Sequence, residues 1–278
     1  MAHCRVKEAE QILDREFPVL NRGFVRLVDY LGSDQRIVQA ARVSYGEGTK
    51  TYREDRGLIH YLLRNRHTSP FEQVNFTFHI KMPIFVARQW VRHRTARMNE
   101  ISGRYSILKD EFYLPDEKHV SLQSKDNRQG RAGEEVPSDL RKEILALLDE
   151  EQRQIYKNYQ KLLSKGIARE LARINLPLSV YTEMYWQMDL HNLFHFLELR
   201  MHPHAQLEIR EYAKTIFSIV EKICPIACEA FKEHVLGSVR FSRKEMKALK
   251  EIIDGKEPPL DGKDLDRFMK KLKMLEDI

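Results

Sequence analysis

The segment Arg92–Tyr105 concentrates residue types that could do chemistry. In fourteen residues it contains four arginines, one histidine, one glutamate and one serine. Guanidinium groups bind the oxygen atoms of a phosphate as forks, and backbone N–H groups around a glycine can complete such a site. The segment therefore indicates either an anion site, most simply for phosphate, or a basic loop exposed to solvent. Local composition leaves both open.

A short amphipathic helix is predicted to position this segment. Pro83 suits the first helical position, and an apolar run follows it. At helical spacing, Gln89, Arg92 and His93 share one face, away from the apolar residues. Residues 99–103 then favour a loop. The helix would deliver its cations to its own C-terminal end, where the helix dipole also favours them.

Strand patterns gather in the first half of the chain and helix patterns in the second. The predicted strands are residues 23–31, 74–80 and 105–114, and the second alternates most clearly. The predicted helices are one that begins near Ser33, then residues 52–63, 137–166, 167–176, 180–187, 190–201 and 205–234, the last disturbed near Pro225. This order favours an α+β fold, with long helices packed against a mostly antiparallel sheet.

Composition narrows the class of protein. The chain is 42% hydrophobic and 32% charged, which permits a sizeable core. Its net charge of +6 comes from 47 basic and 41 acidic residues, so a polyanionic partner is permitted but not required. Neither a membrane span nor the apolar core of a signal peptide is found. Three cysteines, an odd number, favour a reducing compartment, so a cytoplasmic location is expected.

The central segment also carries a recognisable pattern. It contains Arg92-His93-Arg94, seven residues of any type, then Ser102, with Gly-Arg-Tyr after it. This resembles the signature of the flavin-dependent thymidylate synthases. Further blocks resemble that family in the same order, namely residues 67–72, 78–90, 168–173, 176–178 and 204–209. The resemblance implies the same α+β fold and a homotetramer whose sites are shared between subunits.

The resemblance also suggests how the chain is divided. It covers about residues 23–236, so residues 21–236 are expected to form the catalytic domain. Residues 1–20 are then an N-terminal extension, and residues 237–278 a charged helical C-terminal extension that Gly255 and two prolines break in two. Residues 123–136, polar and rich in arginine and glycine, are expected to form a surface loop.

The resemblance implies that the uracil nucleotide dUMP is the substrate. The implied contacts are Gln89, Arg92, Glu100, Ile101, Ser102, Gly103, Arg104, Arg173 and Arg200. Arg104 and Arg173 can fork onto phosphate oxygens, and Gly103 lets the backbone come close. For Arg173, an ion pair with Glu170 remains open. Ser102 is not part of a Gly-x-Ser-x-Gly elbow, so it is expected to bind a ligand rather than to attack one.

Arg200 is the expected catalytic residue. It lies near the end of a predicted helix, where the dipole alone favours a cation. The resemblance implies that it stabilises negative charge on the pyrimidine ring as N3 ionises, and a fixed cation beside a developing anion is a sound catalytic device. Such a reaction needs no cysteine nucleophile. Cys4, Cys224 and Cys228 are accordingly expected to be structural.

FAD binding follows from the resemblance alone, because the sequence has no Gly-x-Gly-x-x-Gly fingerprint. The matching positions are Ser69, Arg92, His93, Arg94, Glu100, Asp189, His191 and His195. Arginines suit the pyrophosphate of FAD. Asp189 and His195 depart from the asparagine of the family pattern, and an aspartate adds negative charge close to a flavin.

The predicted activity is the reductive methylation of dUMP to dTMP. 5,10-methylenetetrahydrofolate would supply the carbon, reduced FAD the hydride, and NADPH the electrons that re-reduce the flavin. The cofactors carry the difficult chemistry, while the protein aligns the ligands and sets the charge around them. No nucleic acid and no membrane is expected as a partner.

Two other classes of protein remain as alternatives. A basic nucleic-acid-binding protein could use the cluster Arg92–Arg104, although only Trp90 and Tyr105 offer stacking rings there. A metal hydrolase could use His191, His195, His202 and His204. Their spacing lacks the glutamate of a His-Glu-x-x-His site, so no metal is expected.

Overall fold

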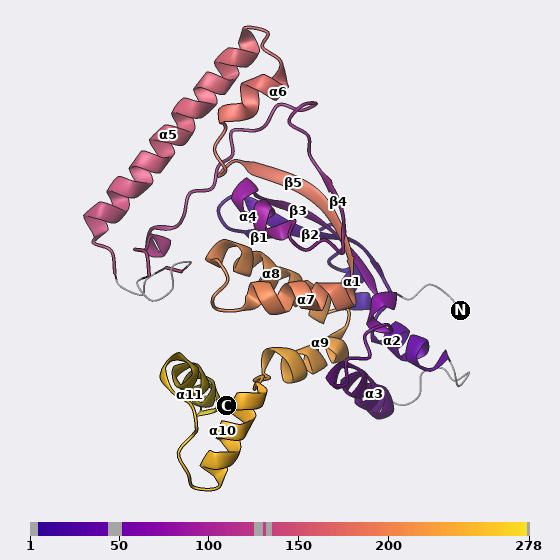
Figure 1. The fold of residues 1–278 in the computed structure, drawn as a ribbon. Helices are drawn as coiled ribbons and strands as arrows, with labels where there is room; N and C mark the ends of the chain where they lie inside the picture. Colours follow the sequence, from indigo (N-terminus) through magenta and orange to yellow (C-terminus); the bar gives the residue numbers. More distant parts are fainter. Residues whose placement is uncertain (1–4, 44–51, 125–129, 132–134, 277–278) are drawn as a thin grey trace. The chain divides into compact units, whose positions relative to one another are not determined.

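The computed structural model describes residues 5–43, 52–124, 130–131 and 135–276. The chain forms two compact units, Met1–Phe231 and Lys232–Ile278. The first contains a sheet with helices packed on it, and the second is a pair of helices (Figure 1).

Within the described residues, five strands form one sheet in which every pairing is antiparallel. The strands are β1 (Glu16–Val19), β2 (Gly23–Leu31), β3 (Asn75–Pro83), β4 (Arg97–Glu100) and β5 (Tyr181–Asp189), in the spatial order β1-β2-β3-β5-β4 (Figure 1). The alternation that predicted β3 buries Phe76, Phe78 and Ile80. The sheet and its helices confirm the predicted α+β class.

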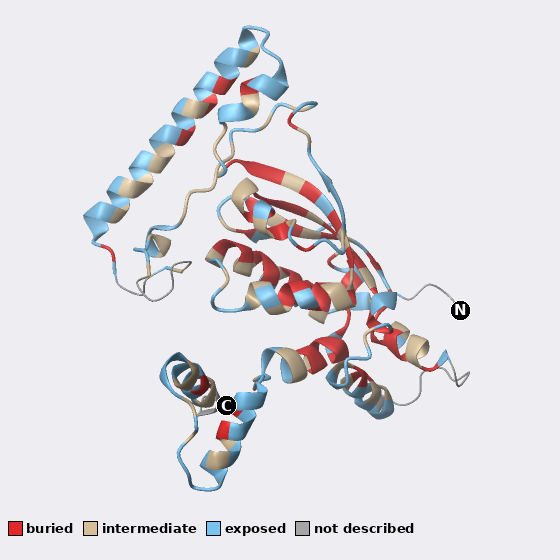
Figure 2. Ribbon diagram, viewed as in Figure 1, coloured by how far each residue is buried: buried red, intermediate tan, exposed pale blue. Residues whose placement is uncertain are grey.

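The helices that cover the sheet meet it through large aromatic side chains. These helices are α4 (Ile84–Trp90), α7 (Leu190–Met201) and α8 (Leu207–Glu221). The Trp90 ring lies 4.8 Å from Phe196 on α7, 5.3 Å from Trp186 on β5 and 5.9 Å from Tyr212 on α8, between ring centroids. Each such pair adds about 0.5–1.5 kcal/mol to the stability that burial provides. Figure 2 shows the buried residues gathered on the strands and these helices. This core fixes the end of α4 against α7.

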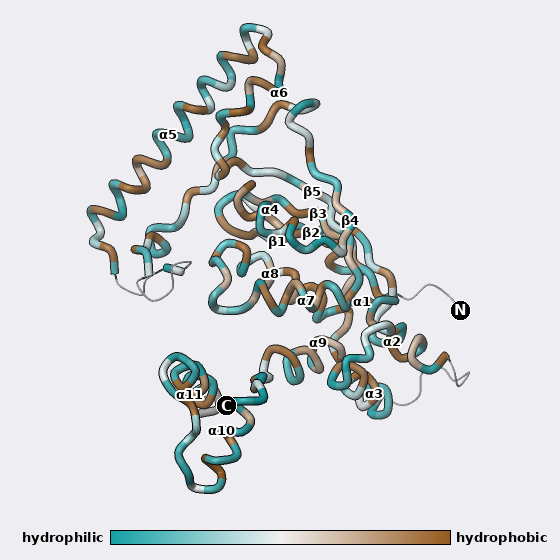
Figure 3. The backbone as a smooth tube through the Cα atoms, viewed as in Figure 1, coloured by the Kyte–Doolittle hydropathy of each residue, from teal (hydrophilic) through white to brown (hydrophobic). Residues whose placement is uncertain are grey.

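A smaller cluster holds the segment that follows β4. The long helix α5 (Ser138–Ser164) and the short helix α6 (Arg169–Ala172) contribute to it. The hydroxyl of Tyr159 accepts the N–H of Leu108 at 3.1 Å, and the hydroxyl of Tyr156 donates to the carbonyl of Leu108 at 3.1 Å. Hydropathy alternates along α5, which suits a helix with one packed face (Figure 3).

The remaining elements are short or flank the sheet. They are α1 (Lys7–Glu10), α2 (Asp34–Ala41), α3 (Tyr52–Arg64), α9 (Pro225–Phe231), and 3-10 turns at Phe71–Gln73, Glu117–His119 and Arg173–Asn175. A π-helical turn covers Lys232–Leu236. Strand β1 lies within the expected N-terminal extension, and it pairs with β2.

Three sequence predictions are wrong. Residues 99–103, predicted as a loop, begin within β4, which ends at Glu100. Residues 180–187, predicted as a helix, form most of β5, which pairs with both β3 and β4. Alternate side chains of this strand, such as Met184 and Trp186, are buried on the helix-covered face, a pattern of period two. Residues 105–114, predicted as a strand, form an irregular segment with one isolated bridge, Phe112 to Val180, because α5 satisfies the backbone of Leu108.

Asp34 caps a helix far away in the sequence. Its carboxylate accepts the N–H of Ile226 at 2.9 Å and that of Ala227 at 3.0 Å, at the start of α9. Pro225, the first residue of α9, has no N–H to satisfy. Burial raises the pKa of Asp34 to about 6. The side chain thus ties α2 to α9.

Asp34→Ala should lower the free energy of unfolding by about 2–4 kcal/mol, because two buried N–H groups lose their acceptor. Urea denaturation at pH 7 measures this loss. The exposed Asp139, in the first turn of α5, gives the matched control, and Asp139→Ala should cost less than about 0.5 kcal/mol. Equal effects of the two substitutions would contradict the assigned cap.

The second unit is built from α10 (Arg243–Ile253) and α11 (Gly262–Glu276). Ser242 and Glu245 form a capping box, and Glu245 also pairs with Lys271 at 2.7 Å. These partners hold the pKa of Glu245 at about 2. The predicted break near Gly255 is confirmed. Among the described residues, no helix is long and apolar enough to cross a membrane.

Candidate active site

Arg200, in the last turn of α7, is held by two neutral acceptors. Its Nε donates to Nε2 of His93 at 3.0 Å, and its Nη2 donates to the backbone carbonyl of Gln89 at 3.4 Å. Both partners lie at or just after the end of α4, which the buried Trp90 anchors. Within the described residues, no carboxylate forms an ion pair with Arg200. The half-buried guanidinium is therefore a positioned cation with no counter-ion in the described part of the chain.

His93 is buried and neutral. Its ring packs on Phe196, with 4.9 Å between the ring centroids, and only 7% of its surface is exposed. Burial, and then the positive charge of Arg200, lower its pKa from 6.5 to about 4. Since Nε2 accepts a hydrogen bond, the proton of the neutral ring is on Nδ1. His93 thus orients Arg200 without competing with it for an anion.

This arrangement predicts a pH dependence of stability. The folded state binds a proton at His93 more weakly than the unfolded chain does, so the contribution of His93 is complete above pH 6.5 and is lost as the pH falls toward 4. We expect a loss of roughly 1–2 kcal/mol, after allowing for solvent screening. Urea denaturation at pH 7 and pH 4.5 measures it. His93→Gln should lack this part of the pH dependence, and identical pH profiles would contradict the assignment.

Gln89 makes a second contact that joins α4 to α8. Its side-chain Nε2 donates to Oε1 of Gln206, the N-cap residue of α8. Gln206 belongs to the block at residues 204–209 that supported the family resemblance, but sequence reasoning gave it no role. The contact depends on packing between segments more than a hundred residues apart. The family resemblance of residues 204–209 was therefore the one sign in the sequence that Gln206 could matter.

Several other predicted substrate residues lie near the start of β5. The N–H of Ile101 donates to the carbonyl of Glu183 at 2.9 Å, and a tight turn through Ser102 follows. A Cβ atom on Gly103 would lie 3.0 Å from Cδ of Arg173, so glycine allows Arg173 to pass close to the turn. Arg104 is exposed and pairs with Glu170 at 3.1 Å. In the described structure, Glu170 therefore pairs with Arg104, and the ion pair between Glu170 and Arg173 is not formed.

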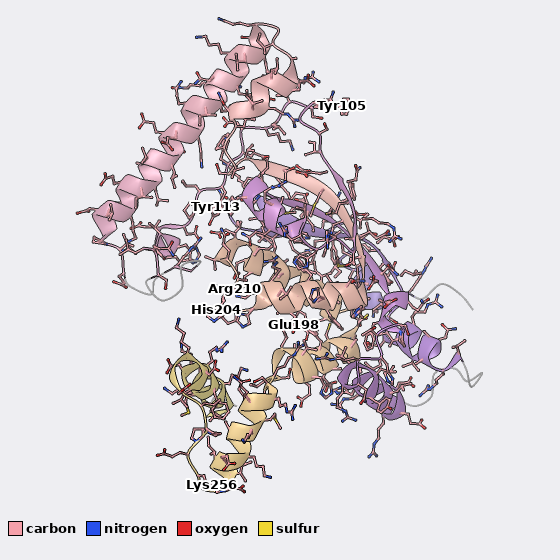
Figure 4. All side chains as sticks on the ribbon, in the orientation of Figure 1. Tyr105, Tyr113, Glu198, His204, Arg210 and Lys256 are labelled. Atoms are coloured by element: carbon pink, nitrogen blue, oxygen red, sulfur yellow. The ribbon has the colours of Figure 1, made fainter. Side chains whose placement is uncertain are left out.

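The predicted dUMP residues therefore form two groups in one chain. The Arg200 group contains Gln89, Arg92 and Arg200, together with His93, a predicted flavin residue, and the Arg173 group contains Ser102, Gly103, Arg104 and Arg173. Strand β4 separates them, since Arg97 lies opposite Gln187 and Glu100 opposite Met184, a span of about 10 Å along β5. Figure 4 shows Tyr105 near α6, beyond the end of β4, and His204 near the end of α7. Among the described residues, the hydrogen bonds of Arg104 and Arg200 stay within their own groups or reach neighbouring elements, and they do not join the two groups.

Glu100, predicted for both substrate and flavin, lies between the groups. Its Oε1 accepts the hydroxyl of Thr182 at 2.7 Å. Thr182 is buried at the start of β5, so this contact fixes an otherwise exposed carboxylate at the end of the edge strand β4. Sequence reasoning missed Thr182, because strand β5 was itself predicted as a helix.

The predicted flavin residues come from several segments of the chain. Arg92 and Arg94 are exposed on the loop after α4, and Ser69 is exposed in the turn before Phe71. His191 is half-buried in the first turn of α7, and His195 is exposed on the same helix. The structure brings His195 close to His93, with 6.1 Å between the ring centroids. Exposed guanidinium groups beside imidazole rings fit the phosphates of FAD.

Asp189 has a structural role as the N-cap of α7. One carboxylate oxygen accepts the N–H of Asn192 at 2.9 Å, and the other accepts its side-chain Nδ2 at 2.7 Å. A negative charge is favourable at a helix N-terminus, which explains why an aspartate is tolerated where the family pattern has asparagine.

Among the described residues, the Arg200 group and the Arg173 group contain neither a cysteine nor a cluster of metal ligands. Cys224 and Cys228 are fully buried at α9, and Cys4 lies outside the described residues. Among the described residues, no three His, Cys, Asp or Glu side chains come together as a metal site.

Comparison with known proteins gives the family. Residues 26–226 match the model of the thymidylate synthase complementing proteins, and residues 239–278 match the thymidylate synthase ThyX C-terminal domain. A flavin-dependent thymidylate synthase of Treponema denticola is 64% identical over 261 residues, which cover 94% of this chain and 98% of the relative. One of Thermus thermophilus is 59% identical over 236 residues, covering 85% of each chain.

A solved structure supports the same family. The crystal structure of a UMP/dUMP methylase, PolB from Streptomyces cacaoi, bound with 5-Br dUMP superposes with a TM-score of 0.72 at 35% identity. The match covers 79% of this chain and 98% of that one. The chain belongs to the flavin-dependent thymidylate synthase family.

Proposed function

We propose that this protein converts dUMP to dTMP, with 5,10-methylenetetrahydrofolate as the carbon donor and NADPH as the source of electrons. The observation that carries this proposal is Arg200, a cation held in place by His93 and Gln89 with no carboxylate partner in the described structure. Such a group is ready to stabilise an anion that forms beside it. FAD, once reduced by NADPH, would supply the hydride that completes the methyl group.

Different residues of the chain bind different parts of dUMP. Arg104 and Arg173 bind the phosphate of dUMP, and the turn at Ser102 and Gly103 offers backbone N–H groups to it. Arg200 lies at the pyrimidine and stabilises its negative charge as N3 ionises. Activation by a fixed cation needs no thiol, in keeping with the burial of Cys224 and Cys228.

The flavin is assigned to the exposed side of the Arg200 group. Arg92 and Arg94 bind its phosphates, while His93, His191 and His195 line the approach to α7. Ser69 and Glu100 contribute polar contacts from neighbouring segments. Asp189 acts mainly by capping α7, and so holds His191 and His195 in position.

The working unit is proposed to be a homotetramer with sites shared between subunits. Support comes from the separation of the Arg173 group from the Arg200 group in one chain. Large apolar side chains are also exposed around the Arg173 group, and four of them are Tyr105 (78%), Leu171 (58%), Ile174 (72%) and Leu178 (62%). Apolar surface of this kind is commonly covered by a protein partner. A second subunit that covers it would bring its own Arg200 group to the nucleotide.

Mixing two variants tests this sharing, with dUMP kept below the wild-type KM so that both variants are almost inactive. Arg200→Ala lacks one group, and a double variant, Arg104→Ala with Arg173→Ala, lacks the other. If one subunit supplies each group, random assortment leaves about a quarter of the sites intact, so the mixed protein regains about a quarter of wild-type activity. Each variant alone, mixed with itself, is the control. Mixed protein that stays as inactive as its parents would mean that each site comes from one chain.

The visible absorption spectrum tests the activity itself. Purified protein should show bands of oxidised flavin that bleach with NADPH under anaerobic conditions, and dUMP should accelerate the bleaching. Formation of dTMP in the complete mixture then measures turnover. A colourless protein that fails to take up FAD would overturn the proposal, and salt-dependent nucleic-acid binding would be measured next. We place the enzyme in the cytoplasm, with no nucleic-acid or membrane partner.

A further inference from the structure

Thr182 places a buried hydroxyl beside the carboxylate of Glu100. It is the second residue of β5, and it lies with Met184 on the helix-covered face of the sheet, where only 3% of its surface is exposed. Its backbone is held from both sides, because Thr182 pairs with Met82 on β3 and the carbonyl after it accepts the N–H of Ile101 at 2.9 Å. A β-branched side chain has few rotamers. The hydroxyl therefore has a fixed position.

This hydroxyl fixes one oxygen of the Glu100 carboxylate. It donates to Oε1 at 2.7 Å, a short hydrogen bond of the kind that a charged acceptor makes. Glu100 lies opposite Met184 on β5, so its side chain is on the same face of the sheet as Thr182. Within the described residues, Oε2 has no hydrogen-bond partner, and no cation forms an ion pair with this carboxylate. Glu100 is thus a positioned acceptor whose second oxygen is free for a ligand.

Glu100 is also next to the turn assigned to the phosphate of dUMP. Ser102, in that turn, follows it by two residues, so the two Cα atoms are at most about 7 Å apart. The deoxyribose is the part of dUMP that is bonded directly to the phosphate. A carboxylate beside the phosphate turn is therefore well placed to meet the sugar.

The chemistry of dUMP favours the same atom. An ionised carboxylate only accepts hydrogen bonds, and dUMP has two donors outside its phosphate, the 3′-hydroxyl of the sugar and N3–H of the base. N3 ionises in the proposed reaction, and a carboxylate beside it would oppose that step, because like charges disfavour each other. The 3′-hydroxyl is therefore the donor that suits Glu100.

We propose that Thr182 is a positioning residue that holds Glu100 for the 3′-hydroxyl of dUMP. This inference rests on the proposed function. By fixing Oε1, the hydroxyl of Thr182 turns Oε2 toward the nucleotide before the nucleotide binds. Without it, the exposed glutamate side chain samples several rotamers, and binding must then restrict them. Loss of the hydroxyl therefore weakens the contact to the sugar.

The binding of two nucleotides tests this role without any turnover. The measured quantity is the dissociation constant of 2′,3′-dideoxyuridine 5′-monophosphate divided by that of dUMP. Calorimetric titration of the flavin-loaded protein, without folate or NADPH, gives both constants. The two ligands differ only in the 3′-hydroxyl, so we expect a ratio of about 10–100 for wild type, as for a hydrogen bond to a charged group. A general loss of structure would weaken both ligands and leave the ratio unchanged.

Three substitutions separate the hydroxyl from its surroundings. Thr182→Val removes the hydroxyl and nearly keeps the shape, so the ratio should fall by about fivefold or more. Thr182→Ser keeps the hydroxyl, and its ratio should stay within about threefold of wild type. Thr77→Val is the matched control on β3. Thr77 lies on the other face of the sheet, where its hydroxyl accepts the side chain of Gln187 at 3.2 Å, and its loss should not change the ratio.

A double-mutant cycle shows whether Thr182 acts through Glu100. Glu100→Ala removes the acceptor, so its ratio should fall to about 1. In that background, Thr182→Val should change the ratio by less than about twofold, because the two residues form one contact. Flavin content and melting temperature are measured for every variant, since Glu100 is also a predicted flavin residue.

Three results would overturn the inference. One is a wild-type ratio in Thr182→Val, whatever its affinity for dUMP. Another is a ratio in Thr182→Ser as low as that in Thr182→Val. The third is a ratio in Glu100→Ala equal to that of wild type, and this comparison stays decisive even if Thr182→Val does not fold. A failure of the proposed function is distinguishable, because in that case the wild-type protein itself forms no dTMP from dUMP.

Discussion

Arg200→Ala should lower kcat for dTMP formation by about 10²–10³-fold and change the KM for dUMP by less than about tenfold. The reason is that Arg200 meets an anion that forms on the pyrimidine ring only during the reaction. Its partners in the structure are neutral, and no carboxylate among the described residues offsets its charge. Steady-state rates, measured with flavin content normalised, give both constants.

Two further variants sharpen this expectation. Arg200→Lys keeps the charge but loses the planar fork that binds His93 and Gln89 together, so an intermediate loss of kcat is expected. Arg88→Ala removes an exposed arginine of α4 and should leave both constants near wild type. Full turnover by Arg200→Ala would rule out the assigned role of this residue.

Arg173→Met should raise the KM for dUMP by about 10–100-fold, because a forked contact to phosphate is lost in both the ground state and the transition state. The kcat should change little. The diagnostic comparison is with deoxyuridine, which has no phosphate. Wild type and variant should use that nucleoside equally poorly. An equal loss with nucleotide and nucleoside would show that Arg173 supports the fold rather than binding the phosphate.

Glu170 supplies the matched control for this group. It pairs with Arg104 in an exposed position, where such an ion pair contributes little to stability. Glu170→Gln should therefore leave folding unchanged and leave Arg104 at least as available to phosphate. A KM for dUMP equal to or below that of wild type is expected.

Much of the fold could be predicted because the local patterns are strong. The alternation in β3 and the helical periodicity of α7 each have one buried face, and both elements form as predicted. Strand β5 was missed although Met184 and Trp186 alternate with less buried positions, because segments with helical patterns precede and follow it. The short edge strand β4 has no buried face, so nothing in its own residues marks it as a strand.

The residue types of the site could be predicted, but not how they group. The family signature brings Arg92 and Ser102 together in the sequence, whereas the fold places them at opposite ends of β4. Conversely, His93 and Arg200 are 107 positions apart and hydrogen-bonded. Asp34 and Ile226 are 192 apart. Such contacts depend on how elements pack, which local periodicity does not contain.

The pairing of β5 also bears on how the chain folds as it is synthesised. Strands β1, β2 and β3 leave the ribosome early, yet β3 gains its second neighbour only when residues 181–189 have appeared. Until then, one long edge of the nascent sheet is open, and an open edge can pair with another chain. The cap that Asp34 provides for α9 arrives later still. Contacts so distant in sequence slow folding, so this protein should depend on chaperones during synthesis more than a helical bundle of equal length.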